Sequence, residues 1–181
     1  MNDSTTILVP LDLSDCSAEV VAKAAELAEL NEASLVLAHV VQPPAGVAPG
    51  APLRPEGAAE PTDAAHYLAQ EARPWLEQQV EQLRGRGLDA GFRITVGRPV
   101  EAIQALADKL GAELIVMGTH GRTGISRLVL GSVAEAVSRR ASCPVVTVRS
   151  QHHSGCDARS CSWCDKHISQ AARAVAAEAD G

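Results

Sequence analysis

Five short apolar runs alternate along this chain with segments of helical periodicity, and this alternation constrains its fold most. The runs are almost continuously apolar, which predicts strands buried on both faces. Strands that alternate with helices favour a parallel sheet with helices on both sides, a doubly wound five-stranded α/β fold. The predicted strands are 6–12, 34–41, 90–96, 113–118 and 144–149, and the predicted helices are 14–31, 64–86, 99–110 and 132–141.

The composition agrees with such a fold. At 181 residues and 46% hydrophobic, the chain can bury one sizeable core but is too short for two. Only 2% of its residues are aromatic, so the core must consist of aliphatic residues and alanine. At the start of the first helix, Ser14 is placed to cap the backbone, with Ser17 at the capping-box position.

Prolines interrupt the regular pattern in two places. Six of the ten lie between residues 42 and 63, together with repeated Gly and Ala, so 43–63 is expected to be a flexible loop without regular elements. This loop follows the carboxyl end of strand 34–41, where it can cover a ligand or serve only as a solvated linker. Pro74 predicts a kink or a new helix start within 64–86.

A glycine pattern lies between the fourth strand and the last helix. Gly118-Thr119-His120-Gly121 is followed nine residues later by Gly131-Ser132. Glycine lets the backbone approach a ligand closely, so that successive N–H groups can converge on phosphate oxygens. The N-terminus of the helix that follows favours an anion at the same place, and Ser132 can add a hydroxyl. The pattern predicts a phosphate-binding loop.

The spacing Gly-x2-Gly-x9-Gly-Ser, in this strand and helix setting, resembles the ATP-binding branch of the universal stress protein family. The resemblance covers residues 5–149. Four further landmarks occur in order: Ile7-Leu8-Val9-Pro10-Leu11-Asp12, Leu37-Ala38-His39-Val40, Gly97-Arg98-Pro99 and Cys143-Pro144-Val145-Val146-Thr147-Val148. The resemblance implies a Rossmann-like fold of the adenine nucleotide alpha hydrolase type over 1–150, and ATP with Mg²⁺ as the ligand.

The resemblance also assigns residues to the two ends of a nucleotide site. Asp12, at the nucleoside end with Pro10, Leu11 and Val40, can accept hydrogen bonds from base or ribose. The residues implied for the ribose and phosphates are Met117, Gly118, Thr119, Gly121, Gly131, Ser132 and Val133. In the intervening loop, Arg122 and Arg127 either offset phosphate charge or are simply solvated, and His120 is expected to have a packing or helix-terminal role rather than to act as a base.

Several functional classes are disfavoured by what the chain lacks. The sequence has no Gly-x4-Gly-Lys-[Ser/Thr] phosphate loop, no Gly-x-Ser-x-Gly elbow, no His-Glu-x-x-His and no kinase-like catalytic set. A formal net charge of −6 argues against nucleic acid as a partner. Residues 1–6 do not resemble a signal peptide, and no apolar run reaches membrane-spanning length. We therefore expect a cytoplasmic protein that is not bound to membranes.

These observations favour binding over catalysis. The chain is interpreted as an ATP-binding regulator of the stress response with slow ATP hydrolysis at most, acting on an unidentified protein partner. A nucleotide-cleaving or adenylate-transferring enzyme is one alternative, and a dimeric scaffold carrying a metal- or redox-responsive tail is another. The apolar strand 144–148 predicts a homodimer, because an unpaired apolar edge invites association.

Cysteines and histidines gather in the C-terminal tail, 151–181. Cys16 and Cys143 are interpreted as packing residues, but Cys156, Cys161 and Cys164 are closely spaced and followed by His167. Thiolate and imidazole ligands at these spacings predict a zinc site, with His152 or His153 in reserve. An iron-sulfur site would need Cys16 or Cys143 as its fourth ligand. A redox pair or incidental thiols would also account for the cysteines of the tail.

Overall fold

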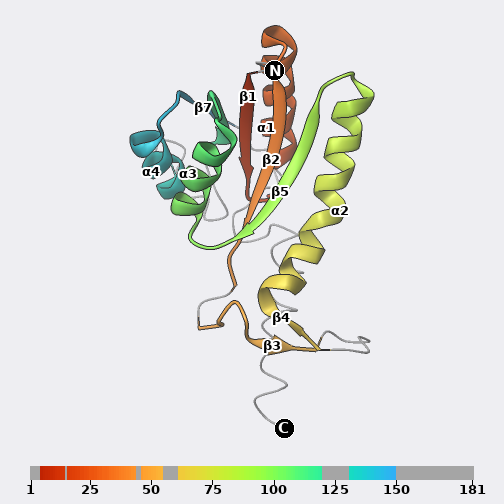
Figure 1. Cartoon of the computed structure of the whole chain (residues 1–181), viewed down its shortest axis with the longest axis vertical. Helices are drawn as coiled ribbons and strands as arrows, with labels where there is room; N and C mark the ends of the chain where they lie inside the picture. Colours follow the sequence, from red (N-terminus) through yellow and green to blue (C-terminus); the bar gives the residue numbers. More distant parts are fainter. Residues whose placement is uncertain (1–4, 15, 44–45, 55–60, 120–130, 150–181) are drawn as a thin grey trace.

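The computed structural model describes residues 5–14, 16–43, 46–54, 61–119 and 131–149. Its main sheet has five parallel strands in the order β5-β2-β1-β6-β7 (Figure 1). The predicted doubly wound α/β fold is therefore confirmed. The strands are β1 (Thr6–Leu11), β2 (Ser34–Val41), β5 (Ala90–Val96), β6 (Leu114–Gly118) and β7 (Val145–Val148).

Helices cover both faces of this sheet (Figure 1). On one face α1 and α2 share a core with Ile7 and Val9 of β1, and on the other α3 and α4 share a second core with Leu8. Neighbouring residues of β1 thus enter two separate cores, as expected for a strand buried on both sides. The helices are α1 (Ser17–Asn31), α2 (Ala64–Gly85), α3 (Pro99–Leu110) and α4 (Ser132–Arg140).

The strand order reverses beside β1. From β1 the chain moves outward through β2 to β5, then returns to the other side of β1 to form β6 and β7. The helices that follow β1 and β6 consequently lie on opposite faces of the sheet. In open parallel sheets, the carboxyl ends of the strands at such a reversal border a crevice in which ligands bind.

The start of the first helix differs from the prediction, and of the two alternatives given for Pro74 the new helix start is excluded. Helix α1 begins at Ser17, and Ser14 lies outside it because the Ser14 hydroxyl donates to Asp12 and does not cap the helix. Helix α2 continues through Pro74 without a new start. A proline leaves the carbonyl four residues earlier without its helical partner. Here that carbonyl belongs to the exposed residue Gln70, where water can replace the missing N–H.

The proline-rich segment contains two short strands, so the expectation that no regular element forms there was wrong. β3 (Pro52–Leu53) pairs antiparallel with β4 (Thr62–Asp63). The pair is fastened to the start of α2, since the backbone N–H of Ala64 donates to Ala51 at 3.0 Å. Figure 1 shows this pair beside the N-terminus of α2, beyond the carboxyl ends of the main strands.

Candidate functional site

A cavity of about 270 Å³ lies at the carboxyl ends of β1, β2 and β6, where the strand order reverses. The sheet and the starts of three helices build its wall, because β1, β5 and β6 lead into α1, α3 and α4 at this edge. Nine residues singled out in the sequence line it together: Pro10, Leu11, Asp12, Val40, Met117, Gly118, Gly131, Ser132 and Val133.

Three further residues assigned to the nucleotide site are not among these. Thr119 lies beside the cavity, where its backbone N–H donates to Val148 and its carbonyl accepts from Gly131. Gly121 and Arg122 lie outside the described residues, as do His120 and Arg127. The same holds for the predicted metal ligands Cys156, Cys161, Cys164 and His167 and for the reserve histidines His152 and His153.

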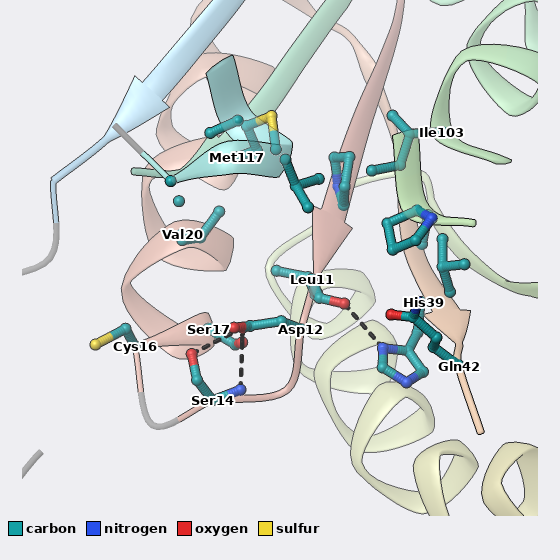
Figure 2. A pocket seen from close by; sticks show the side chains of 18 of the residues that line it. Leu11, Asp12, Ser14, Cys16, Ser17, Val20, His39, Gln42, Ile103 and Met117 are labelled. Atoms are coloured by element: carbon teal, nitrogen blue, oxygen red, sulfur yellow. Dashed lines mark hydrogen bonds between the residues drawn. The ribbon is translucent and has the colours of Figure 1, made fainter. Parts of the chain in front are cut away.

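The Asp12 carboxylate is the one acidic group among the described lining residues. Its Oδ1 accepts hydrogen bonds from the Ser14 backbone N–H (3.1 Å), the Ser14 hydroxyl (2.8 Å) and the Ser17 hydroxyl (3.2 Å) (Figure 2). Its Oδ2 is buried and has no hydrogen-bond partner within the described part of the chain. A buried carboxylate oxygen without a donor is costly, so Asp12, a lining residue of the cavity, keeps one acceptor without a partner.

The turn that carries Asp12 has an unusual backbone. Leu13 has φ +60°, in the left-handed region that a branched side chain adopts at a cost of about 1–2 kcal/mol. Its side chain is only 4% exposed and packs in the core between the sheet and α1. Burial of the leucine therefore offsets the backbone strain and turns the chain back toward α1, with Asp12 left at the cavity.

His39 closes the same end of the cavity from β2. It is opposite Leu11 in the parallel register of β1 and β2 and is 6% exposed. Its ring Nδ1 lies 2.8 Å from the Leu11 carbonyl oxygen (Figure 2). Because a carbonyl can only accept, Nδ1 is the ring nitrogen that carries hydrogen in this contact.

The opposite end of the cavity is built from backbone. The Gly131 N–H donates to the Thr119 carbonyl at 2.7 Å, which ties the start of α4 to the end of β6. The Glu135 N–H then returns to the Gly131 carbonyl at 2.8 Å, so Gly131 is the N-cap of α4. The N–H groups of the first turn, with the positive end of the helix dipole, border the cavity at Ser132 and Val133.

The charges and polarity of the wall suit a ligand with two unlike ends. No lysine or arginine occurs among its described residues, so an anion there would rely on the N–H groups of α4. Between the two ends, the wall is mostly apolar, with Val20, Ile103 and Met117 facing the cavity (Figure 2). A flat apolar group with polar edges, joined to an anion, fits this distribution.

Sequence reasoning missed ten of the lining residues as ligand contacts: Ser14, Cys16, Ser17, Val20, Ala38, His39, Gln42, Pro99, Ile103 and Ala134. Ala38, His39 and Pro99 belong to the quoted landmarks, and their positions at strand and helix ends were the available signal. Cys16 was interpreted as a packing residue, but the structure places it in the cavity wall. Cys143 does pack, against the core beneath α3 and α4, and its burial, reinforced by Asp108, raises the pKa of its thiol.

Two properties of the described residues bear on other functions. None of their helices is long and apolar enough to span a membrane. In the same residues, no group of three or more His, Cys, Asp or Glu side chains is arranged to hold a metal ion.

Comparison with known proteins identifies the family. Residues 4–149 match the model of the Universal stress protein family. The chain is similar to universal stress protein MJ0531 of Methanocaldococcus jannaschii, with 35% identity over 143 residues, 79% of this chain and 81% of the relative. It is also similar to universal stress protein YxiE of Bacillus subtilis, with 31% identity over 146 residues, 79% of this chain and 97% of that protein.

Solved structures show the same architecture. A universal stress protein crystallised in complex with cAMP is 29% identical, with a TM-score of 0.56 over 81% of this chain and 97% of that one. UspA from Lactobacillus plantarum is 24% identical, and its TM-score of 0.64 over 80% of this chain and 97% of that chain supports the fold alone.

Proposed function

Because this chain belongs to the universal stress protein family, we propose that it is a cytoplasmic stress-response regulator that binds ATP with Mg²⁺ in the cavity at the strand reversal. The observation that carries the proposal is the pairing, across one cavity, of an unused carboxylate oxygen with the N-terminus of α4. The relative solved with cAMP supports an adenine nucleotide as the ligand class.

The Asp12 carboxylate sets the orientation of the ligand. Its Oδ2 needs a donor, which an adenine amino group or a ribose hydroxyl can supply. A phosphate at the same place would be repelled, since both groups are negative. The nucleoside therefore lies against Asp12, and the phosphates lie toward Gly131 and Ser132.

Backbone groups and Mg²⁺ would share the charge of the triphosphate. The first-turn N–H groups of α4 and the Ser132 hydroxyl can donate to phosphate oxygens. Mg²⁺ commonly binds through substrate phosphates and waters, with few protein ligands, so an all-protein metal cage is not required. Gly121 and Arg122 are proposed to complete this end of the site, together with Gly118 and Thr119.

We propose binding with slow hydrolysis at most, since the acidic group and the imidazole of the described wall already have structural tasks. Asp12 Oδ1 accepts three hydrogen bonds, and the His39 Nδ1 is committed to Leu11. A nucleotide-cleaving or adenylate-transferring enzyme is the rival function. Steady release of ADP or AMP from ATP at more than about one turnover per second, the low end of ordinary enzyme rates, would favour that rival.

Isothermal titration with Mg-ATP tests the proposal. Wild-type protein should bind one ATP per chain, and Asp12→Asn should weaken binding about tenfold, as expected when an acceptor facing a donor is lost. Asp89→Asn is the matched control, since Asp89 is exposed and precedes β5 at the opposite edge of the sheet. Absence of saturable ATP binding by the wild type would contradict the proposal.

GTP in the same titration distinguishes the two possible donors. If Asp12 contacts the adenine amino group, Asp12→Asn should narrow the preference for ATP over GTP, because guanine carries an acceptor at that position. If Asp12 contacts the ribose, the affinities for ATP and GTP should fall equally.

We also propose a homodimer that forms through β7. This strand pairs only with β6 in the main sheet, so its other edge has no strand partner within the described part of the chain. Val145, Val146 and Val148 are half-buried, and Thr147 is exposed. Sedimentation at micromolar concentration should give twice the monomer mass, and Thr147→Lys should shift it toward monomer. A monomeric wild type, with and without ATP, would contradict this proposal.

A zinc site formed by Cys156, Cys161, Cys164 and His167 is a second candidate function. One described feature favours a link to the nucleotide: β7 ends at the ligand edge, where the Val148 carbonyl accepts from Thr119 at 2.9 Å. Val148 therefore lies beside the proposed phosphate site. Elemental analysis of untagged protein should find about one zinc per chain, lost in a Cys161→Ser, Cys164→Ser double variant. Metal-free wild-type protein with titratable thiols would exclude the site.

A further inference from the structure

Two polar side chains are buried among the described residues, and both attach to the turn that carries Asp12. Ser17, 2% exposed, donates to Asp12 Oδ1, and His39, 6% exposed, donates to the Leu11 carbonyl (Figure 2). A buried polar group is costly unless it is hydrogen-bonded, so each contact holds its partner firmly. The consecutive residues Leu11 and Asp12 are thereby tied to two different elements, β2 and α1.

The turn needs this support because of its backbone. Leu13 follows Asp12 directly and has φ +60°. A branched residue keeps such a conformation only where its surroundings determine it. Ser17 holds the carboxylate side of the turn, and His39 holds the peptide that enters it. Without His39, the peptide between Leu11 and Asp12 would lose its side-chain contact with β2.

We infer that His39 is a positioning residue for the nucleotide site: its Nδ1–H fixes the Leu11–Asp12 peptide and so keeps the Asp12 carboxylate placed for the nucleoside. This inference rests on the proposed nucleotide binding. It assigns His39 an indirect role, through Asp12, and it requires hydrogen on Nδ1. The role depends on a donor at one position of the side chain and not on an imidazole as such.

Asparagine and glutamine separate this role from simple space filling. Asparagine places its amide nitrogen two bonds from Cβ, as histidine places Nδ1, whereas glutamine places it one bond farther. Titration with Mg-ATP should show His39→Asn within about threefold of wild type. His39→Gln and His39→Leu should each weaken binding about tenfold, the usual effect of one lost hydrogen bond.

A double-variant cycle tests the path through Asp12. In an Asp12→Ala background, His39→Leu should weaken ATP binding by less than about twofold further, because the group that His39 positions is already gone. Thermal unfolding of each variant shows whether it is folded. If His39→Leu does not fold, the comparison of His39→Asn with His39→Gln decides the question by itself.

Three results would overturn the inference while nucleotide binding stands: wild-type affinity in both His39→Leu and His39→Gln, equal loss in His39→Asn and His39→Gln, or a full tenfold loss in the Asp12→Ala background. If the wild type does not bind ATP, the proposed function fails first and this inference fails with it. Rescue by asparagine alone, together with non-additivity at Asp12, is the result that we expect.

Discussion

At the β1 end of the cavity side chains hold the backbone in place, whereas at the α4 end the backbone holds itself. Asp12 is fixed by Ser14 and Ser17, and Leu11 by His39. Across the cavity, the 2.7 Å bond from Gly131 to Thr119 and the first turn of α4 require no side chain. The end proposed for the nucleoside thus depends on residue identity, and the end proposed for the phosphates depends on close access to backbone.

This difference predicts how each end responds to substitution. At the β1 end, removing a side-chain atom should remove affinity, because a hydrogen bond or its support is lost. At the α4 end, removing atoms should matter little, while adding them should block the approach of phosphate to the N–H groups. Four sets of variants test this difference between the two ends, and they are given in order of decreasing effect.

Gly131→Val should weaken ATP binding the most, by about 100-fold, because a branched side chain would occupy the proposed phosphate position. The φ of −59° at Gly131 is accessible to valine, so the variant should fold with only the modest loss expected of a poor N-cap. Gly91→Val is the matched control. A Cβ at Gly91 meets nothing within 4 Å and lies in a strand, so its affinity for ATP should be that of the wild type.

Asp12→Ala should weaken ATP binding about 30-fold and lower stability by about 2 kcal/mol, since it removes the acceptor of Ser14 and Ser17 along with the ligand contact. Titration measures the affinity, and urea denaturation measures the stability. If affinity stays unchanged while stability falls, Asp12 has a structural role only, and the proposed orientation of the nucleotide is wrong.

Leu13 offers a test of backbone strain at the β1 end. Leu13→Ala should lose about 2–3 kcal/mol of stability through the lost burial. Leu13→Gly should be at least as stable as Leu13→Ala despite its smaller side chain. At positive φ, the backbone conformation costs glycine about 1 kcal/mol less than it costs alanine. At an ordinary φ the order would be reversed. Urea denaturation of the pair decides, and a less stable glycine variant would contradict the strained turn.

Ser132→Ala should have the smallest effect, less than about threefold on the affinity for ATP, because the backbone N–H groups of α4 remain in place. Its side chain is exposed and its hydroxyl contributes one of several donors. A loss as large as that of Asp12→Ala would show that side chains control both ends, and the contrast between them would disappear.

The strands and most of the site could be predicted from the sequence because apolar runs and glycine spacing are local signals. The ranges 34–41 and 90–96 agree with β2 and β5, and Asp12 and Gly131 lie at the expected edge. The role of His39 could not be predicted, since it depends on the register that sets His39 opposite Leu11. Register is a property of paired strands, and neither strand encodes it alone.

Three further differences between the prediction and the structure have separate physical causes. Capping rules expect Ser14 and Ser17 to accept from backbone N–H groups, but α1 has no side-chain cap, and both hydroxyls instead donate to the charged Asp12 carboxylate. No glycine or asparagine marks the positive φ at Leu13, so the sequence carries no local sign of that turn. β3 and β4 are two residues each, too short for a hydrophobic period to reveal.

A structure of the protein with Mg-ATP bound would show which end of the nucleotide contacts which end of the cavity. We expect one nucleotide in the cavity, with the nucleoside against Asp12 and the phosphates at the backbone of Gly131 and Ser132. A nucleotide in the reverse orientation, with phosphates near Asp12, would contradict the two-ended cavity. A nucleotide bound elsewhere on the molecule would contradict the site itself.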